Sequence, residues 1–180
     1  MLWINGQEVK VNHFPDNTQL IKIDTNKLSF YDDSTTIRWR YENDEECMTL
    51  WYLVNHIRAH KEFNVLINLS LMYIPNARMD RVKSNDEVFT LKYFADFINS
   101  LNFNCVYVLD PHSYVSEALI NRIYKKSLSF DYIWKWLEER DGIDLNSVMF
   151  YFPDDGAYKR YKDTFTGTNI LYGKKNRDWD

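Results

Sequence analysis

The spacing of apolar residues changes along the chain, and each change predicts a different kind of element. In the first forty residues, apolar and polar positions alternate within three short segments, 19–24, 27–31 and 35–41. This alternation is typical of half-buried β-strands. After Asn43, apolar residues recur every three or four positions and acidic residues stand at the start, so we expect a helix over 44–61.

Two short apolar runs and an amphipathic segment come next. Residues 63–69 and 103–109 are almost continuously apolar, as in strands that are covered on both faces. Between them, Ser84 and Glu87 have the spacing of a helix capping box, and apolar residues follow at helical spacing as far as Leu101. This pattern predicts a helix that begins at the capping box.

The last third of the chain continues the alternation of helices and strands. We expect helices over 116–124, 130–140 and 157–164, and strands over 147–152 and 169–172. Buried strands that alternate with helices predict an α/β fold with a mainly parallel sheet of right-handed βαβ units. With 180 residues, we expect a single α/β domain over 1–180.

Loops at one edge of such a sheet are the first place to look for chemistry. In parallel sheets, ligands bind outside the carboxyl ends of the strands. Three loops are predicted to leave such ends, and each carries ionisable residues: 75–85, 110–113 and 153–158. We therefore expect these loops to lie at a common edge.

Composition narrows the class of protein. The formal net charge of −4 gives no overall electrostatic reason to bind nucleic acid. No apolar run is long enough to cross a membrane and no signal-peptide pattern is present, so we expect a cytoplasmic protein without nucleic-acid or membrane partners. The two cysteines do not have metal-binding spacing and are interpreted as reduced thiols.

Carboxylate, imidazole and guanidinium groups are the candidate chemistry of the three loops. Asp110 and His112 are two potential ligands of a divalent ion, although for this pair taken alone an Asp-Pro turn with an incidental histidine is the simpler explanation. Asp154 can be a ligand or a helix N-cap. Arg78 and Arg81 suit phosphate oxygens, or a local ion pair with a nearby aspartate. Carboxylates without cysteine favour Mg²⁺ that holds a phosphate over a structural zinc.

Several common motifs are absent from the sequence. It contains no P-loop, no dinucleotide-binding glycine turn, no His-Glu-x-x-His and no Gly-x-Ser-x-Gly elbow. P-loop enzymes, conventional dinucleotide enzymes, zinc proteases and α/β-hydrolases are therefore disfavoured.

Taken in order, the loop sequences resemble those of one enzyme family. Pro75-Asn76-Ala77-Arg78-Met79-Asp80, Asp110-Pro111-His112 and Pro153-Asp154-Asp155-Gly156 are similar to three segments of ribose-phosphate pyrophosphokinase, also called phosphoribosyl pyrophosphate synthetase. Phe14-Pro15-Asp16 and Lys175-Asn176-Arg177 resemble two further segments of that family. The resemblance is to the N-terminal domain and spans nearly the whole chain.

The resemblance implies a fold and an activity. The fold would be a phosphoribosyltransferase-like three-layer domain with a mainly parallel sheet and an N-terminal β extension. The reaction would transfer pyrophosphate from Mg-ATP to ribose 5-phosphate, giving phosphoribosyl pyrophosphate and AMP, in a homo-oligomer. The residues that the resemblance would place at the ATP are Phe14, Asp16, Arg78 and Asp80.

The same resemblance assigns the remaining roles. His112 and Asp154 would hold Mg²⁺, and Lys175 and Arg177 would be catalytic. The family's C-terminal half, with the acidic loop that binds ribose 5-phosphate, has no counterpart in these 180 residues, so the chain by itself is expected to be incomplete. Two alternatives stay open: a catalytically inactive nucleotide-binding or assembly domain, and a small phosphohydrolase that uses Asp110, His112 and Asp154.

Overall fold

Two compact units make up the chain. The computed structural model describes residues 1–24, 34–60, 66–140 and 142–175, and its units are Met1–Lys126 and Ser127–Asp180. The strand expected over 27–31 lies outside the described residues. A single domain over 1–180 stays a prediction.

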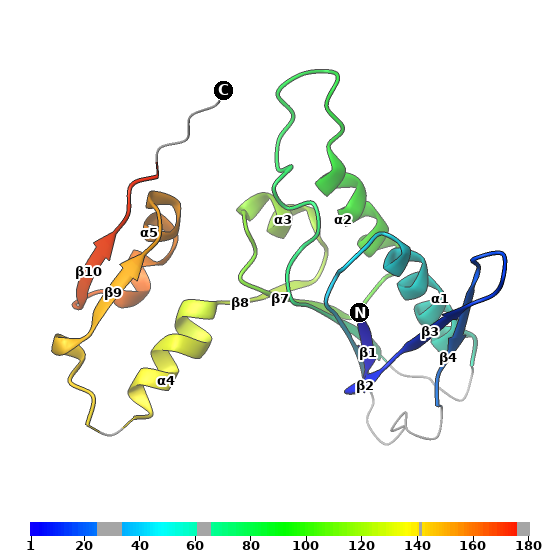
Figure 1. Cartoon of the computed structure of the whole chain (residues 1–180), viewed down its shortest axis with the longest axis horizontal. Helices are drawn as coiled ribbons and strands as arrows, with labels where there is room; N and C mark the ends of the chain where they lie inside the picture. Colours follow the sequence, from blue (N-terminus) through cyan, green and yellow to red (C-terminus); the bar gives the residue numbers. More distant parts are fainter. Residues whose placement is uncertain (25–33, 61–65, 141, 176–180) are drawn as a thin grey trace. The chain divides into compact units, whose positions relative to one another are not determined.

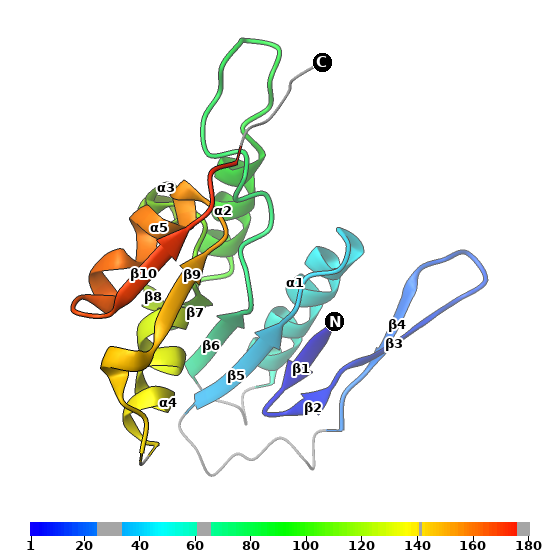
Figure 2. The same ribbon diagram turned by 60° about the vertical axis from the view of Figure 1, so that its left-hand side comes forward.

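A six-stranded sheet forms the centre of the first unit (Figure 1). Its strands have the order β2-β1-β5-β6-β7-β8 and are all labelled in Figure 2. Strands β5 to β8 are parallel, whereas β1 runs antiparallel to both β2 and β5. The predicted α/β fold with a mainly parallel sheet is therefore confirmed. The strands are β1 (Leu2–Ile4), β2 (Gln7–Glu8), β5 (Ser34–Trp39), β6 (Leu66–Leu71), β7 (Cys105–Leu109) and β8 (Ile123–Lys126).

The helices of this unit connect successive parallel strands. They are α1 (Glu45–Ala59), α2 (Thr90–Ser100) and α3 (Tyr114–Leu119). Trp39 of β5 is fully buried and shows which face of the sheet α1 and α2 cover. Its indole Nε1 donates to Glu46 of α1 at 2.9 Å, and its ring centroid lies 6.0 Å from that of Phe94 of α2. Both helices therefore pack on the face of the sheet that carries Trp39.

An antiparallel hairpin stands beside α1 (Figure 2). It consists of β3 (Lys10–His13) and β4 (Gln19–Lys22), with His13 opposite Gln19. Together with β1 and β2 it makes up the N-terminal β extension of the fold.

The predicted start of α2 is wrong. The helix begins at Thr90, six residues after Ser84. Glu87 accepts a hydrogen bond from the backbone N of Lys83 at 2.7 Å, and its own N donates to the carbonyl of Ser84 at 3.3 Å. The capping-box residues thus close a local turn, which satisfies the same hydrogen-bonding groups without a helix.

The predicted helix over 116–124 is also partly wrong. Helix α3 ends at Leu119, and β8 pairs in parallel with β7 from Ile123 onward. Arg122 has a positive φ of 52°, which no helix contains, and its guanidinium donates to the carbonyl of Phe103 at 2.8 Å. Strand pairing across the sheet therefore overrides the helical spacing of this segment.

The second unit has its own small sheet and aromatic core. Strands β9 and β10 pair in parallel and form a two-stranded sheet. The ring of Phe165 packs against those of Phe150, Phe152 and Trp134. The elements are η2 (Leu128–Trp134, a π-helical segment), α4 (Lys135–Glu138), η3 (Leu145–Ser147), β9 (Met149–Phe152), α5 (Asp155–Tyr161), η4 (Lys162–Phe165) and β10 (Asn169–Tyr172).

Candidate functional site

Two of the three predicted loops meet at one edge of the six-stranded sheet. Strands β6 and β7 are adjacent and parallel, with Leu71 opposite Val108, so both release the chain at the same edge. The loop after β6 carries Asp80, and the loop after β7 carries His112 and Ser113. All three side chains are close enough to interact electrostatically.

Asp80 is held in its ionised form by its neighbours. Arg81 Nε donates to Asp80 Oδ1 at 3.0 Å, and this bond is the main reason that the pKa of Asp80 is lowered. The Ser113 hydroxyl and the His112 ring lower the pKa of Asp80 further. The Ser113 oxygen is buried and makes no hydrogen bond with the described residues, so it acts on Asp80 as a nearby dipole. Arg81 and Asp80 thus form the local ion pair that the sequence analysis gave as the alternative to phosphate binding.

Tight turns set the direction of both loops. Asn76 and Asp110 have positive φ angles of 61° and 48°, a conformation that Asn and Asp tolerate better than most residues. Asp110 N donates to the carbonyl of Lys126 at 2.8 Å, which ties the end of β7 to β8. Pro111 is buried and His112 is exposed. The Asp-Pro-His segment is therefore a turn that presents the histidine at the sheet edge.

Arg78 lies on the exposed side of the other loop. Its neighbours Ile74, Pro75 and Ala77 are buried and anchor the chain against the core. The guanidinium is thereby carried on a fixed segment and remains accessible to an anionic ligand.

The hairpin tip holds Phe14 and Asp16 in a defined turn. Asp16 Oδ1 accepts hydrogen bonds from the backbone N of Thr18 at 3.0 Å and from its hydroxyl at 2.7 Å. These bonds lower the pKa of Asp16. Asn17 has a positive φ of 64°, and the Phe14 side chain is 48% exposed. The tip therefore presents an aromatic ring next to a carboxylate that is already ordered.

Helix α1 anchors the strand pair next to the tip of this hairpin. Gln19 Nε2 donates to Glu45 Oε1 at 2.9 Å, and Thr49 Oγ1 donates to Gln19 Oε1 at 3.0 Å. His13 Nε2 also contacts Glu45 Oε1, at 2.5 Å. The hydrogen bonds from His13 and Gln19 lower the pKa of Glu45. The position of the hairpin tip is thus fixed relative to the first turn of α1.

Asp154 belongs to the second unit and caps α5. Its Oδ1 accepts a hydrogen bond from the backbone N of Ala157 at 2.8 Å, so the helix-cap interpretation is correct for this oxygen. Asp155 pairs with Lys159 at 2.5 Å and raises the pKa of that lysine. A role of Asp154 at Mg²⁺ stays a prediction.

The predicted catalytic residues follow β10 in the second unit. Lys175 is exposed, and Arg177 lies outside the described residues. Gly173 precedes them, and its N donates to the carbonyl of Phe152 at 2.9 Å, which holds the chain beside β9. Of the predicted site residues, Asp80 and His112 are the pair that the first unit brings together.

The described residues contain no group of three or more His, Cys, Asp or Glu side chains that could hold a metal ion. Mg²⁺ does not need such a group, since it usually keeps several waters and binds one or two carboxylates together with substrate phosphates. The predicted ligands of such an ion are one imidazole, His112, and one carboxylate, Asp154, and their role stays a prediction. In the described part of the chain, no helix is both long and apolar enough to span a membrane.

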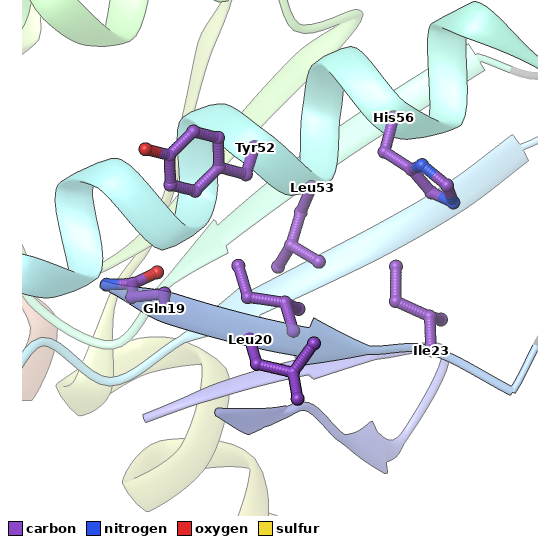
Figure 3. A pocket seen from close by; sticks show the side chains of 7 residues that line it. Gln19, Leu20, Ile23, Tyr52, Leu53 and His56 are labelled. Carbon is purple, nitrogen blue, oxygen red and sulfur yellow. The ribbon is translucent and has the colours of Figure 1, made fainter. Parts of the chain in front are cut away.

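A cavity between the hairpin and α1 was not found from the sequence (Figure 3). It measures ≈ 460 Å³ and is lined by Gln19, Leu20, Ile21, Ile23, Tyr52, Leu53 and His56. Burial, together with the neighbouring His60, lowers the pKa of His56. Alternation within 19–24 predicted the strand, but the partner of its apolar face depends on tertiary packing. Ser113 was missed as well, and its place directly after the Asp-Pro-His turn was the available signal.

Comparison with known proteins identifies the fold. No family model matches the sequence, and no curated protein matches it. The crystal structure of phosphoribosylpyrophosphate synthetase from Mycobacterium smegmatis is similar, with a TM-score of 0.59 and 16% sequence identity. The match covers 95% of this chain and 57% of that chain, so the chain spans little more than half the length of this similar protein. At this identity the likeness is one of fold, and it agrees with the α/β architecture expected from the sequence.

Proposed function

We propose that this chain is the ATP-side domain of an enzyme that transfers pyrophosphate from Mg-ATP to ribose 5-phosphate. The products would be phosphoribosyl pyrophosphate and AMP. The observation that carries the proposal is the proximity of Asp80 and His112, which come from two loops 32 positions apart and interact at the carboxyl edge of a parallel sheet. The fold likeness to a phosphoribosylpyrophosphate synthetase supports it.

Arg78 and Asp80 would contact the nucleotide at this edge. The exposed guanidinium of Arg78 is suited to a bidentate contact with phosphate oxygens. Asp80 is already ionised and oriented by Arg81, so its remaining hydrogen-bonding capacity can select a donor group of the ligand.

Phe14 and Asp16 would serve a second subunit. The exposed ring of Phe14 offers a stacking surface for adenine, and the ordered carboxylate of Asp16 offers an acceptor beside it. Because the hairpin is anchored to α1, the tip would be presented as a fixed surface to a neighbouring copy. A homo-oligomer is therefore part of the proposal.

Mg²⁺ would be held by His112 and Asp154 together with phosphate oxygens of the nucleotide. When bound, the ion would neutralise negative charge on the phosphates. Lys175 and Arg177 would add positive charge around the transferring group. Pyrophosphoryl transfer depends mainly on positioning and on cations matched to developing negative charge, which is the chemistry that these side chains supply.

Nucleotide binding is the first test. Titration calorimetry with MgATP should show binding, and Arg78→Ala should weaken it by about tenfold or more, as expected for the loss of a charged hydrogen bond. Arg140→Ala is the matched control, because it removes the same charge from a guanidinium that stacks 4.2 Å from the Trp136 ring in the second unit. Absence of MgATP binding at millimolar nucleotide, or equal effects of the two variants, would contradict the proposal.

Turnover separates the enzyme from its alternative. AMP release from ATP that requires ribose 5-phosphate would establish the synthetase reaction. The alternative is a catalytically inactive nucleotide-binding or assembly domain of the same fold. MgATP binding that depends on Arg78, without AMP release from a chain extended by its downstream sequence, would support that alternative. Phosphate release that does not need ribose 5-phosphate would contradict both.

A further inference from the structure

We propose that His56 and His60 form a binding site for a Zn²⁺ ion at the C-terminal end of α1. The two histidines are separated by four positions, so they lie on the same side of the helix, one turn apart. Their ring centroids are 4.5 Å apart, with an angle of 71° between the ring planes. The site is separate from Asp80 and His112 and does not rest on the function proposed above.

The separation of the rings matches what a shared metal ion requires. Zn²⁺ binds imidazole nitrogen at about 2.0–2.1 Å, and two rings bound tetrahedrally to one ion would have centroids roughly 5 Å apart. The observed 4.5 Å is close to this value. Both side chains are exposed, so an ion can reach both rings from the solvent.

The end of the helix adds a favourable field for a cation. Helix α1 ends at Ala59 with His60 as its C-cap, and the last carbonyl groups of a helix carry partial negative charge. The nearest guanidinium on the same turn is occupied elsewhere. Arg58 donates to the carbonyls of Leu101 at 2.5 Å and Asn102 at 2.9 Å, so its positive charge is tied to the end of α2.

The ligand set selects the type of ion. Imidazole nitrogens bind Zn²⁺, Ni²⁺ and Cu²⁺ well, whereas Mg²⁺ prefers oxygen ligands. Helical histidines four positions apart are a recurring pair of zinc ligands. Two protein ligands leave two positions of a tetrahedral ion for water or for a further ligand.

The location gives the site a structural consequence. Figure 3 shows the His56 ring pointing from α1 toward Ile23, where it lines the cavity between the helix and the hairpin. An ion bound by His56 would therefore stand beside the end of β4, on the same hairpin that carries Phe14. Zn²⁺ would stiffen the end of α1 next to this cavity.

Titration calorimetry with Zn²⁺ on the full chain, prepared without a histidine tag, tests the site. We expect one ion per chain, and His56→Ala and His60→Ala should each weaken binding by about tenfold or more, because each removes half of the protein ligands. His13→Ala is the matched control and should bind Zn²⁺ as the unchanged chain does. An excess of Mg²⁺ should not compete.

A second measurement identifies the ligands directly. In imidazole ¹⁵N NMR spectra, Zn²⁺ should shift signals of His56 and His60 and leave those of His13 and His112 in place. Far-UV circular dichroism should be the same for all variants, and His56→Gln and His60→Gln provide substitutions that preserve more of the side chain. Absence of Zn²⁺ binding, binding that survives loss of both histidines, or binding that is lost with His112→Ala or Cys47→Ser would overturn the proposal.

Discussion

The carboxylate of Glu46 links the first turn of α1 to the centre of the sheet, and its removal should be costly. Its Oε2 accepts hydrogen bonds from the indole N of Trp39 and from the backbone N of Glu42, both at 2.9 Å. Its Oε1 contacts the N-terminal ammonium of Met1. Trp39 is 0% exposed, so its indole N is shielded from water while Glu46 is in place.

The expected loss of stability follows from these contacts. An unsatisfied buried donor such as the Trp39 indole costs about 1–3 kcal/mol. The ion pair with the partly exposed Met1 ammonium contributes about 0–1 kcal/mol. An acidic residue in the first turn of a helix contributes about 0.3–1 kcal/mol. We expect Glu46→Ala to lower the free energy of unfolding by about 2–4 kcal/mol, and Glu46→Gln by about 1–2 kcal/mol, because glutamine keeps one acceptor oxygen.

Urea unfolding followed by far-UV circular dichroism measures the effect, with tryptophan fluorescence as a second probe of a single transition. Glu45→Ala is the control, since this neighbouring carboxylate is exposed and accepts no hydrogen bond from a buried indole. In a Trp39→Phe background the cost of Glu46→Ala should fall by about 1–3 kcal/mol, because the buried donor is gone. Equal losses for the Glu45 and Glu46 variants, or an unchanged cost in the Trp39→Phe background, would refute the reasoning.

Substitutions at three further positions test other parts of the structure. Arg81 lowers the pKa of Asp80 below its ordinary value of 3.8, so the ionised carboxylate stabilises the fold above that pH, and this contribution is lost as the pH falls through the folded-state pKa. Arg81→Ala should raise the pKa of Asp80, measured by a carboxyl ¹³C NMR titration. An unchanged pKa would contradict the role of Arg81. Asp154→Ala should destabilise the second unit by about 1 kcal/mol, whereas Asp154→Asn keeps the helix cap. If Asp154 also binds Mg²⁺, the Asn variant should still lose affinity for MgATP, measured by calorimetry. Gly173→Ala should destabilise the second unit by about 1–3 kcal/mol, because the added Cβ would lie 2.8 Å from the carbonyl oxygen of Pro153. Thermal unfolding measures the effect, and an unchanged melting temperature would show that the backbone relaxes.

The spacing of apolar residues identified those helices and strands that bury one face or both faces regularly along their length. The spacing after Asn43 predicted α1, and the apolar runs predicted β6 and β7, because each buries one regular face or both. Strand β8 was missed because it lies at the sheet edge with one inward residue, Ile123, while Tyr124 packs beside Tyr107 of β7 with ring centroids 5.7 Å apart. Its conformation is decided by pairing with β7, which local spacing does not encode.

The difference between local spacing and strand pairing also decides which part of the site could be predicted. Asp80 and His112 could be expected to approach each other, since the loops after two neighbouring parallel strands share an edge. Asp154 was expected at that edge as well, on the assumption that residues 147–152 belong to the same sheet. Within the second unit that strand, β9, pairs with β10, and the place of Asp154 beside this edge stays a prediction.

The two interpretations of Asp110-Pro111-His112 are parts of one structure. A positive φ at Asp110 is uncommon for a residue other than glycine, and the hydrogen bond from its N to Lys126 offsets part of the cost. The buried Pro111 then restricts the backbone, and His112 emerges at the edge next to Asp80. A turn in this place does not compete with a ligand role for the histidine. It is the conformation that brings an imidazole from β7 to a carboxylate from the loop after β6, and the proposed nucleotide site depends on it.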